Sequence, residues 1–228
     1  MSPSREPIVN IISAPSGSGK STLVNELLRL VPDLDFSISY TTRPPRGSER
    51  DGKQYYFVSR EQFEQMIRAD DFLEHADVFG NYYGTARRFL EEARQKGHDL
   101  LLDIDVQGAA QIKRQLPDAF SIFVLPPDRK TLEERLRKRG EDSGPVIERR
   151  LSAAGREIEN YNKYDYILIN EDLAESIANL VALVCSERLR RSRLPLSKAE
   201  NELLARAERC RLASVKDRVE RILDSFKK

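Results

Sequence analysis

The residues from Ile12 to Thr22, ISAPSGSGKST, have the types and the spacing needed to bind a chain of phosphates. An apolar run ends here, a loop with two glycines follows, and Lys20 and Ser21 open a helical pattern. Backbone N–H groups in such a loop donate to phosphate oxygens, and the start of the helix adds partial positive charge. The lysine reaches the β- and γ-phosphates of a nucleoside triphosphate, and the Ser21 hydroxyl is an oxygen ligand for Mg²⁺. The predicted triphosphate-binding residues are Ala14, Pro15, Ser16, Gly17, Ser18, Gly19, Lys20, Ser21 and Thr22.

This loop departs at one position from the P-loop pattern G-x-x-x-x-G-K-[ST], because Ala14 stands where the first glycine usually stands. The Cβ of alanine is tolerated there only if the φ angle stays negative. A turn of glycine and serine beside a helix, without a ligand, is the alternative explanation. A P-loop specifies a nucleoside triphosphate but not the acceptor, since transfer to water gives an NTPase and transfer to a small molecule gives a kinase.

A second stretch, TTRPPRGSERDGKQYYF at 41–57, could bind a single phosphate group. Arg43 and Arg46 are separated by two prolines, which stiffen the chain and prevent a regular helix. Two guanidinium groups on a stiff segment can grip one phosphate bidentately, and Tyr55 adds a phenolic donor. A nonspecific nucleic-acid patch would need several phosphate contacts and stacked bases, and nearby acidic side chains oppose that use.

Two further strings raise the alternative of a GTPase, which would carry DxxG and NKxD after its P-loop. Both occur, as DVQG at 105–108 and NKYD at 162–165. The second string precedes the apolar run YILI, whereas ligands of a parallel sheet bind at the carboxyl ends of the strands. NKYD is therefore expected at the opposite end of its strand, and a GTPase remains only an alternative to a kinase.

Short apolar runs separated by helical patterns must position these residues. We predict buried strands at 8–13, 100–104, 121–125 and 166–169, and helices at 21–30, 87–96 and 130–138. This alternation predicts an α/β fold with a parallel sheet flanked by helices. Residues 37–86 and 128–157 interrupt the alternation, so we expect both to be insertions beside the core.

The composition excludes several classes of protein. The 228 residues are 39% hydrophobic, which suits a folded domain, and a formal net charge of +1 does not suit a chain that coats nucleic acid. No apolar run is long enough to span a bilayer, and the first residues lack the pattern of a signal peptide. Cys185 and Cys210 are the only cysteines, so we expect neither a disulfide framework nor a zinc site, and a reducing cytoplasm.

The last residues, 187–228, are basic, with 13 basic and 7 acidic side chains. Pro195 should end the preceding helix. Beyond it, apolar residues recur at steps of four and three, which predicts a helix with one apolar face formed by Val215, Val219, Ile222 and Phe226. We interpret this segment as a helix packed on its own domain. A seam between two copies of the chain and a patch for an anionic partner remain alternatives.

Several longer strings resemble the guanylate kinase family. Thr41–Val58 is similar to the string T-T-R-x-x-R-x-x-E-x-x-G-x-x-Y-x-F-V of that family. Further similar strings are FLEHADVFGNYYGT at 72–85, LLLDIDVQGA at 100–109, RLRKRG at 135–140, ERRL at 148–151 and DYILINED at 165–172. The resemblance covers roughly residues 7–190, and the joint occurrence of these strings in this order is very specific.

The resemblance implies a P-loop kinase core with an inserted GMP-binding region and a mobile lid. The implied guanylate kinase domain is 1–190, with the core at 1–36, 87–127 and 158–190, the GMP-binding region at 37–86 and the lid at 128–157, followed by a helical extension at 191–228. The implied activity is a Mg²⁺-dependent, reversible phosphoryl transfer from ATP to GMP that gives ADP and GDP. ATP and GMP are then the small-molecule partners, without nucleic acid or membrane, and a homo-oligomer could form through the extension.

The resemblance also implies roles for single residues. The implied ligands of the GMP phosphate are Arg43, Arg46, Tyr55 and Tyr83, those of guanine are Ser39, Glu74 and Thr85, and Asp103 and Asp105 would lie near both nucleotides. Arg135, Arg139 and Arg150 resemble lid arginines that close on the transferring phosphoryl group, and Asn170 resembles a contact to the adenine of ATP. The expected catalytic residues are Lys20, Arg43 and these three lid arginines.

Elementary chemistry supports the assignment of Glu74 to guanine. Guanine presents N1–H and N2–H₂ side by side, so one carboxylate can accept both, whereas the N1 lone pair of adenine repels it. A site built on such hydrogen bonds can reject the wrong base by ~10⁴-fold. Simpler explanations remain, because Asp103 and Asp105 could cap the following helix and the lid arginines could form surface ion pairs. A non-catalytic scaffold domain and a kinase for another nucleotide are the alternative functions.

Overall fold

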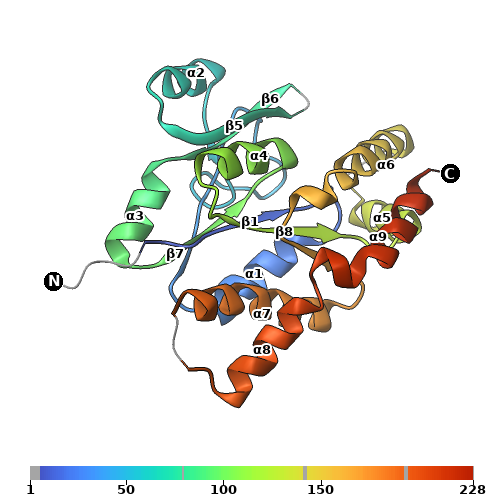
Figure 1. Cartoon of the computed structure of the whole chain (residues 1–228). Helices are drawn as coiled ribbons and strands as arrows, with labels where there is room; N and C mark the ends of the chain where they lie inside the picture. Colours follow the sequence, from blue (N-terminus) through green and yellow to red (C-terminus); the bar gives the residue numbers. More distant parts are fainter. Residues whose placement is uncertain (1–5, 79, 141–142, 193–194, 228) are drawn as a thin grey trace. The chain divides into compact units, whose positions relative to one another are not determined.

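The computed structural model describes residues 6–78, 80–140, 143–192 and 195–227 (Figure 1). The predicted kinase domain at 1–190 and the predicted extension at 191–228 also include residues that lie outside the described ones, namely 1–5, 79, 141–142, 193–194 and 228. The chain folds as two compact units. The first combines the chain up to Ile11 with Asp33–Ala119, and the second combines Ile12–Pro32 with the chain from Phe120 onward. The predicted GMP-binding region thus falls within the first unit and the predicted lid within the second.

A five-stranded parallel sheet confirms the predicted α/β fold. Its order is β2-β7-β1-β8-β9, formed by Leu34–Phe36, Asp99–Asp103, Val9–Ser13, Phe120–Leu125 and Tyr166–Ile169. Every residue of β1 and β8 is buried, which explains their continuous apolar sequence. The four predicted strands are confirmed to within a residue at each end. The sequence did not reveal β2, because three residues are too few to show a periodicity.

The second unit carries the helices α1 (Lys20–Leu30), α5 (Arg129–Arg139), α6 (Gly144–Ile158), α7 (Leu173–Ser192), α8 (Lys198–Glu208) and α9 (Leu212–Phe226), and the short 3₁₀ helix η1 (Tyr161–Lys163). Helix α5 begins where the Asp128 carboxylate accepts the Thr131 N–H at 2.6 Å, and it ends at Gly140 with a φ of 69°. The helices predicted at 21–30 and 130–138 are therefore confirmed. Helices α5 and α6 occupy the segment predicted to be the lid.

The first unit contains a smaller mixed sheet of order β4-β3-β6-β5, formed by Tyr56–Phe57, Tyr40–Thr41, Asn81–Ala86 and Phe72–Val78. Strands β5 and β6 of this sheet are labelled in Figure 1. Helix α2 (Arg60–Arg68) begins with a capping box between Ser59 and Gln62, and its Phe63 ring stacks on Phe72 at 4.4 Å between centroids. Helices α3 (Arg88–Lys96) and α4 (Val106–Gln115) complete this unit, and α3 confirms the helix predicted at 87–96.

The extension packs on its own chain, as the apolar face of its sequence predicts. Instead of a single helix after Pro195, it forms α8 and α9, and Val215, Val219 and Ile222 of α9 are buried. At its far end, Phe226 packs on the apolar cluster of α5 and α6 formed by Leu132, Leu136, Ile147, Leu151 and Ala154.

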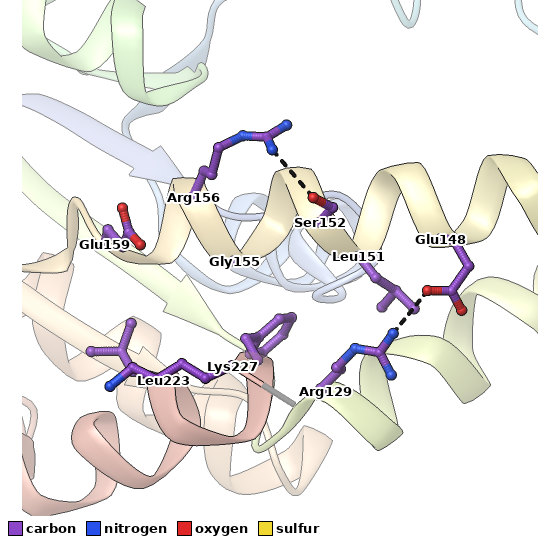
Figure 2. Close-up of a pocket in the computed structure, with 10 residues that line it drawn as sticks. Arg129, Glu148, Leu151, Ser152, Gly155, Arg156, Glu159, Leu223 and Lys227 are labelled. Carbon is purple, nitrogen blue, oxygen red and sulfur yellow. Dashed lines mark hydrogen bonds and ion pairs between the residues drawn. The ribbon is translucent and has the colours of Figure 1, made fainter.

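Figure 2 shows the place where α9 meets α5 and α6, around a pocket with a charged rim. The backbone N–H of Arg129 donates to the Ser225 hydroxyl at 3.0 Å, and the Arg129 side chain donates to Glu148 at 2.9 Å. A Cβ added at Gly155 would lie 3.6 Å from the Phe226 Cβ, which is an ordinary van der Waals contact, so Phe226 packs directly against the helix at this glycine. Among the described residues, no helix has both the length and the apolar character needed to cross a membrane.

Candidate active site

The P-loop joins the end of β1 at Ser13 to the start of α1 at Lys20. Gly17 and Gly19 have φ angles of 91° and 90°, and the Ser18 N–H donates to the Pro15 carbonyl at 3.1 Å. Among the described non-glycine residues, only Asp33 and Asp70 have positive φ. Ala14 therefore has the negative φ that its Cβ requires. Both glycines, by contrast, occupy the left-handed region that other residues seldom adopt.

The loop is packed closely against α5 and against the residue that follows β9. A Cβ added at Gly17 would lie 2.8 Å from Leu136 Cδ2, and one added at Gly19 would collide with the side-chain amide of Asn170. The two glycines are therefore required by backbone angle and by space. Their absence of side chains lets the backbone of the loop come close to its neighbours.

A small hydrogen-bond network holds the P-loop from one side. The Asn170 side chain, 4% exposed, donates to the Ser18 carbonyl at 2.7 Å. Arg135 donates to the same carbonyl at 3.3 Å and to the Asn170 carbonyl at 2.8 Å. Burial lowers the pKa of the Arg135 guanidinium below its ordinary value. Asn170, predicted to contact adenine, and Arg135, predicted to be a lid arginine, thus both hold the backbone of the loop.

The other two predicted lid arginines lie at different places. Arg150, on α6, donates to the Ser16 hydroxyl at 3.4 Å. Arg139 is the last residue of α5 and is exposed. The structure therefore brings Arg135 and Arg150 to the P-loop and leaves Arg139 exposed at the C-terminal end of α5.

A different cluster, built from side chains, forms around Arg43 in the first unit. Strand β3 pairs with β6 so that Thr41 lies opposite Tyr83. Arg43, two residues further on, is 6% exposed, and its Nε donates to the Tyr83 hydroxyl at 3.2 Å. Its guanidinium also lies 5.3 Å from the centroid of the Tyr55 ring. Three of the four predicted phosphate ligands are thus brought together, and Arg46 lies exposed three residues along the same loop.

The Tyr55 hydroxyl stays protonated. Burial raises its pKa to about 12, and the negative charge of Asp103 adds to this shift. The rings of Tyr55 and Tyr83 meet edge to face at 5.8 Å. Tyr55 is therefore a neutral donor at physiological pH, as the recognition of a phosphate oxygen requires.

Glu74 is a buried carboxylate, 3% exposed, whose position follows from strand register. It lies opposite Thr85 in the pairing of β5 with β6, and the Thr85 hydroxyl donates to Glu74 Oε1 at 2.7 Å. Burial raises the pKa of Glu74 to about 7, against the lowering effect of the Thr85 hydrogen bond, and the charge of Asp105 raises it further. This carboxyl group is therefore poised to ionise near neutral pH.

Helix α4 supports Glu74 from the other side. Gln115 and Gln111 donate to the carbonyls of Leu73 and His75, the two neighbours of Glu74, each at 2.7 Å. A Cβ added at Gly108, on the same helix, would collide with Glu74 Oε2. Sequence reasoning missed Gly108, although its string DVQG was noted as a GTPase motif. In this fold the glycine of DVQG makes room for a carboxylate.

The remaining predicted residues have mixed outcomes. Asp105 caps α4, accepting the Gly108 N–H at 2.8 Å, so the capping explanation holds for this residue. Asp103 ends β7 and lies close enough to Tyr55 to raise its pKa. Ser39 is 7% exposed, and its carbonyl accepts the Tyr56 N–H at 2.9 Å. The string NKYD precedes β9, as expected, and its Asp165 accepts the Ser121 N–H at 2.8 Å, which gives it a structural use.

Comparison with known proteins identifies the family. The family described as guanylate kinase matches residues 5–187. The guanylate kinase of Koribacter versatilis (strain Ellin345) is 58% identical over 220 residues, which cover 95% of this chain and 94% of that protein. The guanylate kinase of Escherichia coli (strain K12) is 49% identical over 185 residues, 80% of this chain and 89% of that protein. The crystal structure of guanylate kinase from Anaplasma phagocytophilum is similar with a TM-score of 0.64 at 35% identity, covering 89% of this chain and 96% of that chain. The chain therefore belongs to the guanylate kinase family of ATP:GMP phosphotransferases.

Proposed function

We propose that the kinase activity of this chain is carried by two phosphate-binding clusters of different design, one for each nucleotide. The reaction is the reversible transfer of the γ-phosphoryl group of ATP to GMP, which gives ADP and GDP. The observation that carries the identity of the acceptor is the buried carboxylate of Glu74, fixed by Thr85 at 2.7 Å in the same small sheet that holds Tyr83.

On the donor side, the N–H groups of residues 14–19 and the Lys20 ammonium would bind the β- and γ-phosphates of ATP. The left-handed glycines and the start of α1 at Lys20 support this proposal. Asn170 would contact adenine with the part of its amide that the Ser18 carbonyl does not use. Thr22 follows in the first turn of the helix, where a hydroxyl can donate to a phosphate oxygen.

Ser21 would be the protein ligand of Mg²⁺. Its side chain is exposed in the first turn of α1, directly after Lys20. Mg²⁺ is commonly held by one or two protein oxygens together with substrate phosphates and water, so a single hydroxyl fits its preference. When bound, the ion would supply neutralisation of charge on the phosphates.

On the acceptor side, Arg43, Arg46, Tyr55 and Tyr83 would bind the phosphate of GMP through charge-assisted and phenolic hydrogen bonds. Glu74, when ionised, would accept N1–H and N2–H₂ of guanine. Thr85 fixes the carboxylate, and Ser39 would read a further edge of the base. Asp103 and Asp105 would lie near the bound nucleotides, with Asp105 acting partly through its cap on α4.

The chemical step would depend on positioning and charge rather than on covalent catalysis. The GMP phosphate is already largely ionised at neutral pH, so it attacks without a strong general base. Lys20, Arg43, Arg135, Arg139 and Arg150 would stabilise the charge on the transferring group. Closure of the lid, formed by α5 and α6, would exclude water and so prevent hydrolysis of ATP.

A coupled assay of ADP release with GMP, AMP, CMP or UMP as the acceptor tests this proposal. We expect turnover with GMP at least about a thousandfold faster than with AMP, from the size of the effect that buried hydrogen bonds produce. Equal rates with AMP would refute the role of Glu74. ADP release at the same rate without an acceptor would indicate an NTPase, and no turnover with any nucleotide would indicate a scaffold domain.

Two further proposals concern the setting of the enzyme. We propose a cytoplasmic location, since the two cysteines are not arranged as a disulfide framework, and cell fractionation tests it. Self-association through residues 191–228 would have to use a surface other than the apolar face of α9, because that face is buried within its own chain. Sizing of the full chain against a chain without α8 and α9 tests this second proposal.

A further inference from the structure

Glu49 lies in the loop that carries Arg43 and Arg46 but is not among the residues expected to touch GMP. Both oxygens of its carboxylate accept from Arg43, Oε2 from Nη1 at 2.9 Å and Oε1 from Nη2 at 3.0 Å. Oε2 also accepts the backbone N–H of Arg46 at 2.8 Å. One acidic side chain therefore holds the guanidinium of the first arginine and the backbone of the second.

We propose that Glu49 is a positioning residue, which holds the Arg43 guanidinium in the orientation that receives the phosphate of GMP. This inference rests on the proposed role of Arg43 as a ligand of that phosphate. Glu49 itself does not touch the nucleotide but acts through Arg43 and through the loop at Arg46.

The two edges of the Arg43 guanidinium have different partners. Glu49 occupies the edge formed by Nη1 and Nη2, and the Pro44 carbonyl takes a further N–H of Nη1 at 2.8 Å. The other edge carries the Nε N–H and one N–H of Nη2, and the Tyr83 hydroxyl lies there, 3.2 Å from Nε. Because Tyr83 is itself a proposed phosphate ligand, the phosphate would approach this second edge. Glu49 can then stay in place when GMP binds.

The negative charge of Glu49 repels the phosphate of GMP. The orientation that Glu49 gives to the Arg43 guanidinium must therefore favour binding by more than this repulsion opposes it. Burial raises the pKa of Glu49, but the hydrogen bonds from Arg43 and Arg46 lower it more, and the carboxyl group is ionised at neutral pH. The Arg43 side chain is only 6% exposed, so without Glu49 its Nη1 would keep the Pro44 carbonyl, while its Nη2 would lose its carboxylate acceptor with little water to replace it. It would turn toward another acceptor, and bidentate recognition would lose its geometry.

The substitution Glu49→Gln tests this role, because it keeps the shape of the side chain and removes one charged acceptor. We expect the KM for GMP to rise at least about tenfold, with a smaller fall in kcat and no change in the KM for ATP. Glu49→Asp, which keeps the charge but shortens the reach, should restore part of the affinity for GMP. Glu64→Gln is the matched control, since Glu64 is 42% exposed and pairs only loosely with Arg60 at 3.6 Å.

Guanosine separates orientation of Arg43 from a general loss of structure. It lacks the phosphate, so Glu49→Gln should leave inhibition by guanosine unchanged while binding of GMP weakens. Equal weakening of guanosine and GMP would show a structural role and overturn the inference, as would an unchanged or lower KM for GMP.

Arg43→Ala, measured in parallel, separates a failure of the proposed role of Arg43 from a failure of the inference about Glu49. If it leaves the KM for GMP unchanged, the proposed function of Arg43 is wrong; if it raises that KM and Glu49→Gln does not, only the inference about Glu49 is wrong.

Discussion

The P-loop and the cluster around Arg43 both bind phosphate in our proposal, but they are built from different parts of the chain. The P-loop offers backbone N–H groups from consecutive residues. The positions that we expect not to tolerate substitution are Gly17, Gly19 and Lys20. The Arg43 cluster offers side chains that lie 40 residues apart in sequence, such as Arg43 and Tyr83. Its geometry depends on strand register and on Glu49 rather than on a local turn.

This difference predicts where each site is vulnerable. A backbone site should fail when a glycine gains a side chain or when its one charged residue is lost, and it should tolerate most other changes. A side-chain site should weaken in steps, one donor at a time, because each donor is held by its own contacts. The following variants test this comparison, from the largest expected effect to the smallest.

Lys20→Ala should lower kcat by more than about a thousandfold, because Lys20 is the one charged side chain within the loop from Ala14 to Thr22, where the β- and γ-phosphates would bind. ADP release in a coupled assay measures this. Lys216→Ala, an exposed lysine on α9, is the control and should retain full activity. Retention of substantial turnover by the Lys20 variant would show that the loop does not serve the chemical step.

Glu74→Ala should reduce the preference for GMP over AMP by about a thousandfold, since the loss of a buried acceptor leaves guanine donors unpaired. The ratio of kcat/KM for the two nucleotides is the measurement. Glu61→Ala removes an exposed carboxylate from α2 and serves as the control. An unchanged ratio in the Glu74 variant would show that another group reads the base.

Gly19→Ala should raise the KM for ATP by about tenfold or more, because φ at this position is 90° and a Cβ would collide with Asn170. Ala14→Gly is the matched variant in the same loop. It should change the KM for ATP by less than about threefold, because Ala14 already has a negative φ. Equal effects of the two changes would contradict the requirement for a glycine at position 19.

Binding of guanosine should tighten severalfold as the pH rises from about 6 to 8, because the pKa of Glu74 is raised to about 7 and only the ionised form accepts from guanine. Guanosine is used because the GMP phosphate titrates in the same range. Calorimetry in buffers of different ionisation enthalpy should show a proton released near pH 7, and Glu74→Gln should abolish that release.

The same ionisation affects stability with the opposite sign. Since the pKa of Glu74 is raised from 4.5 to about 7 on folding, the unfolded chain loses its proton first as the pH rises. Glu74 therefore lowers the free energy of unfolding between about pH 4.5 and 7, and the loss is complete above that range. The melting temperature of the Glu74→Gln variant, measured across this pH range, should lack this part of the pH dependence.

Phe226→Ala should lower the free energy of unfolding of the second unit by about 2 kcal/mol, because it opens a gap against the cluster of α5 and α6. Leu173→Ala is the control, since that side chain is 46% exposed and should cost less than about 0.5 kcal/mol. Denaturant unfolding measures both. A loss of stability as small as that of the control would mean that Phe226 contributes little to the apolar cluster of α5 and α6.

The sequence predicts the parts of this molecule whose physics is local. The P-loop, the buried strands, the capped helices and the apolar face of α9 follow from residues that are neighbours in sequence. The family could be named because its strings occur together in order, and the comparisons confirm it. The residue-level roles stay predictions.

What the sequence could not show depends on contacts between distant residues. Gly108 needs Glu74, 34 positions earlier, to explain why a side chain is excluded there. Glu49 is part of the string that resembles the family, but its hydrogen bonds to Arg43 and to the backbone of Arg46 are visible only in the structure. Asp105 caps its own helix, as the simpler explanation predicted, and its expected place near the nucleotides stays a prediction.

The packing of Phe226 on α5 and α6 has a consequence for the order of events during synthesis. Helices α5 and α6 leave the ribosome well before α9, because β9, α7 and α8 must be made in between. Until then the apolar cluster of Leu132, Leu136, Ile147 and Leu151 lacks its last member. Contacts of such long sequence separation form late, and uncovered apolar surface is what chaperones bind. We therefore expect the pair α5 and α6 to complete its packing last within the second unit, when α9 supplies Phe226.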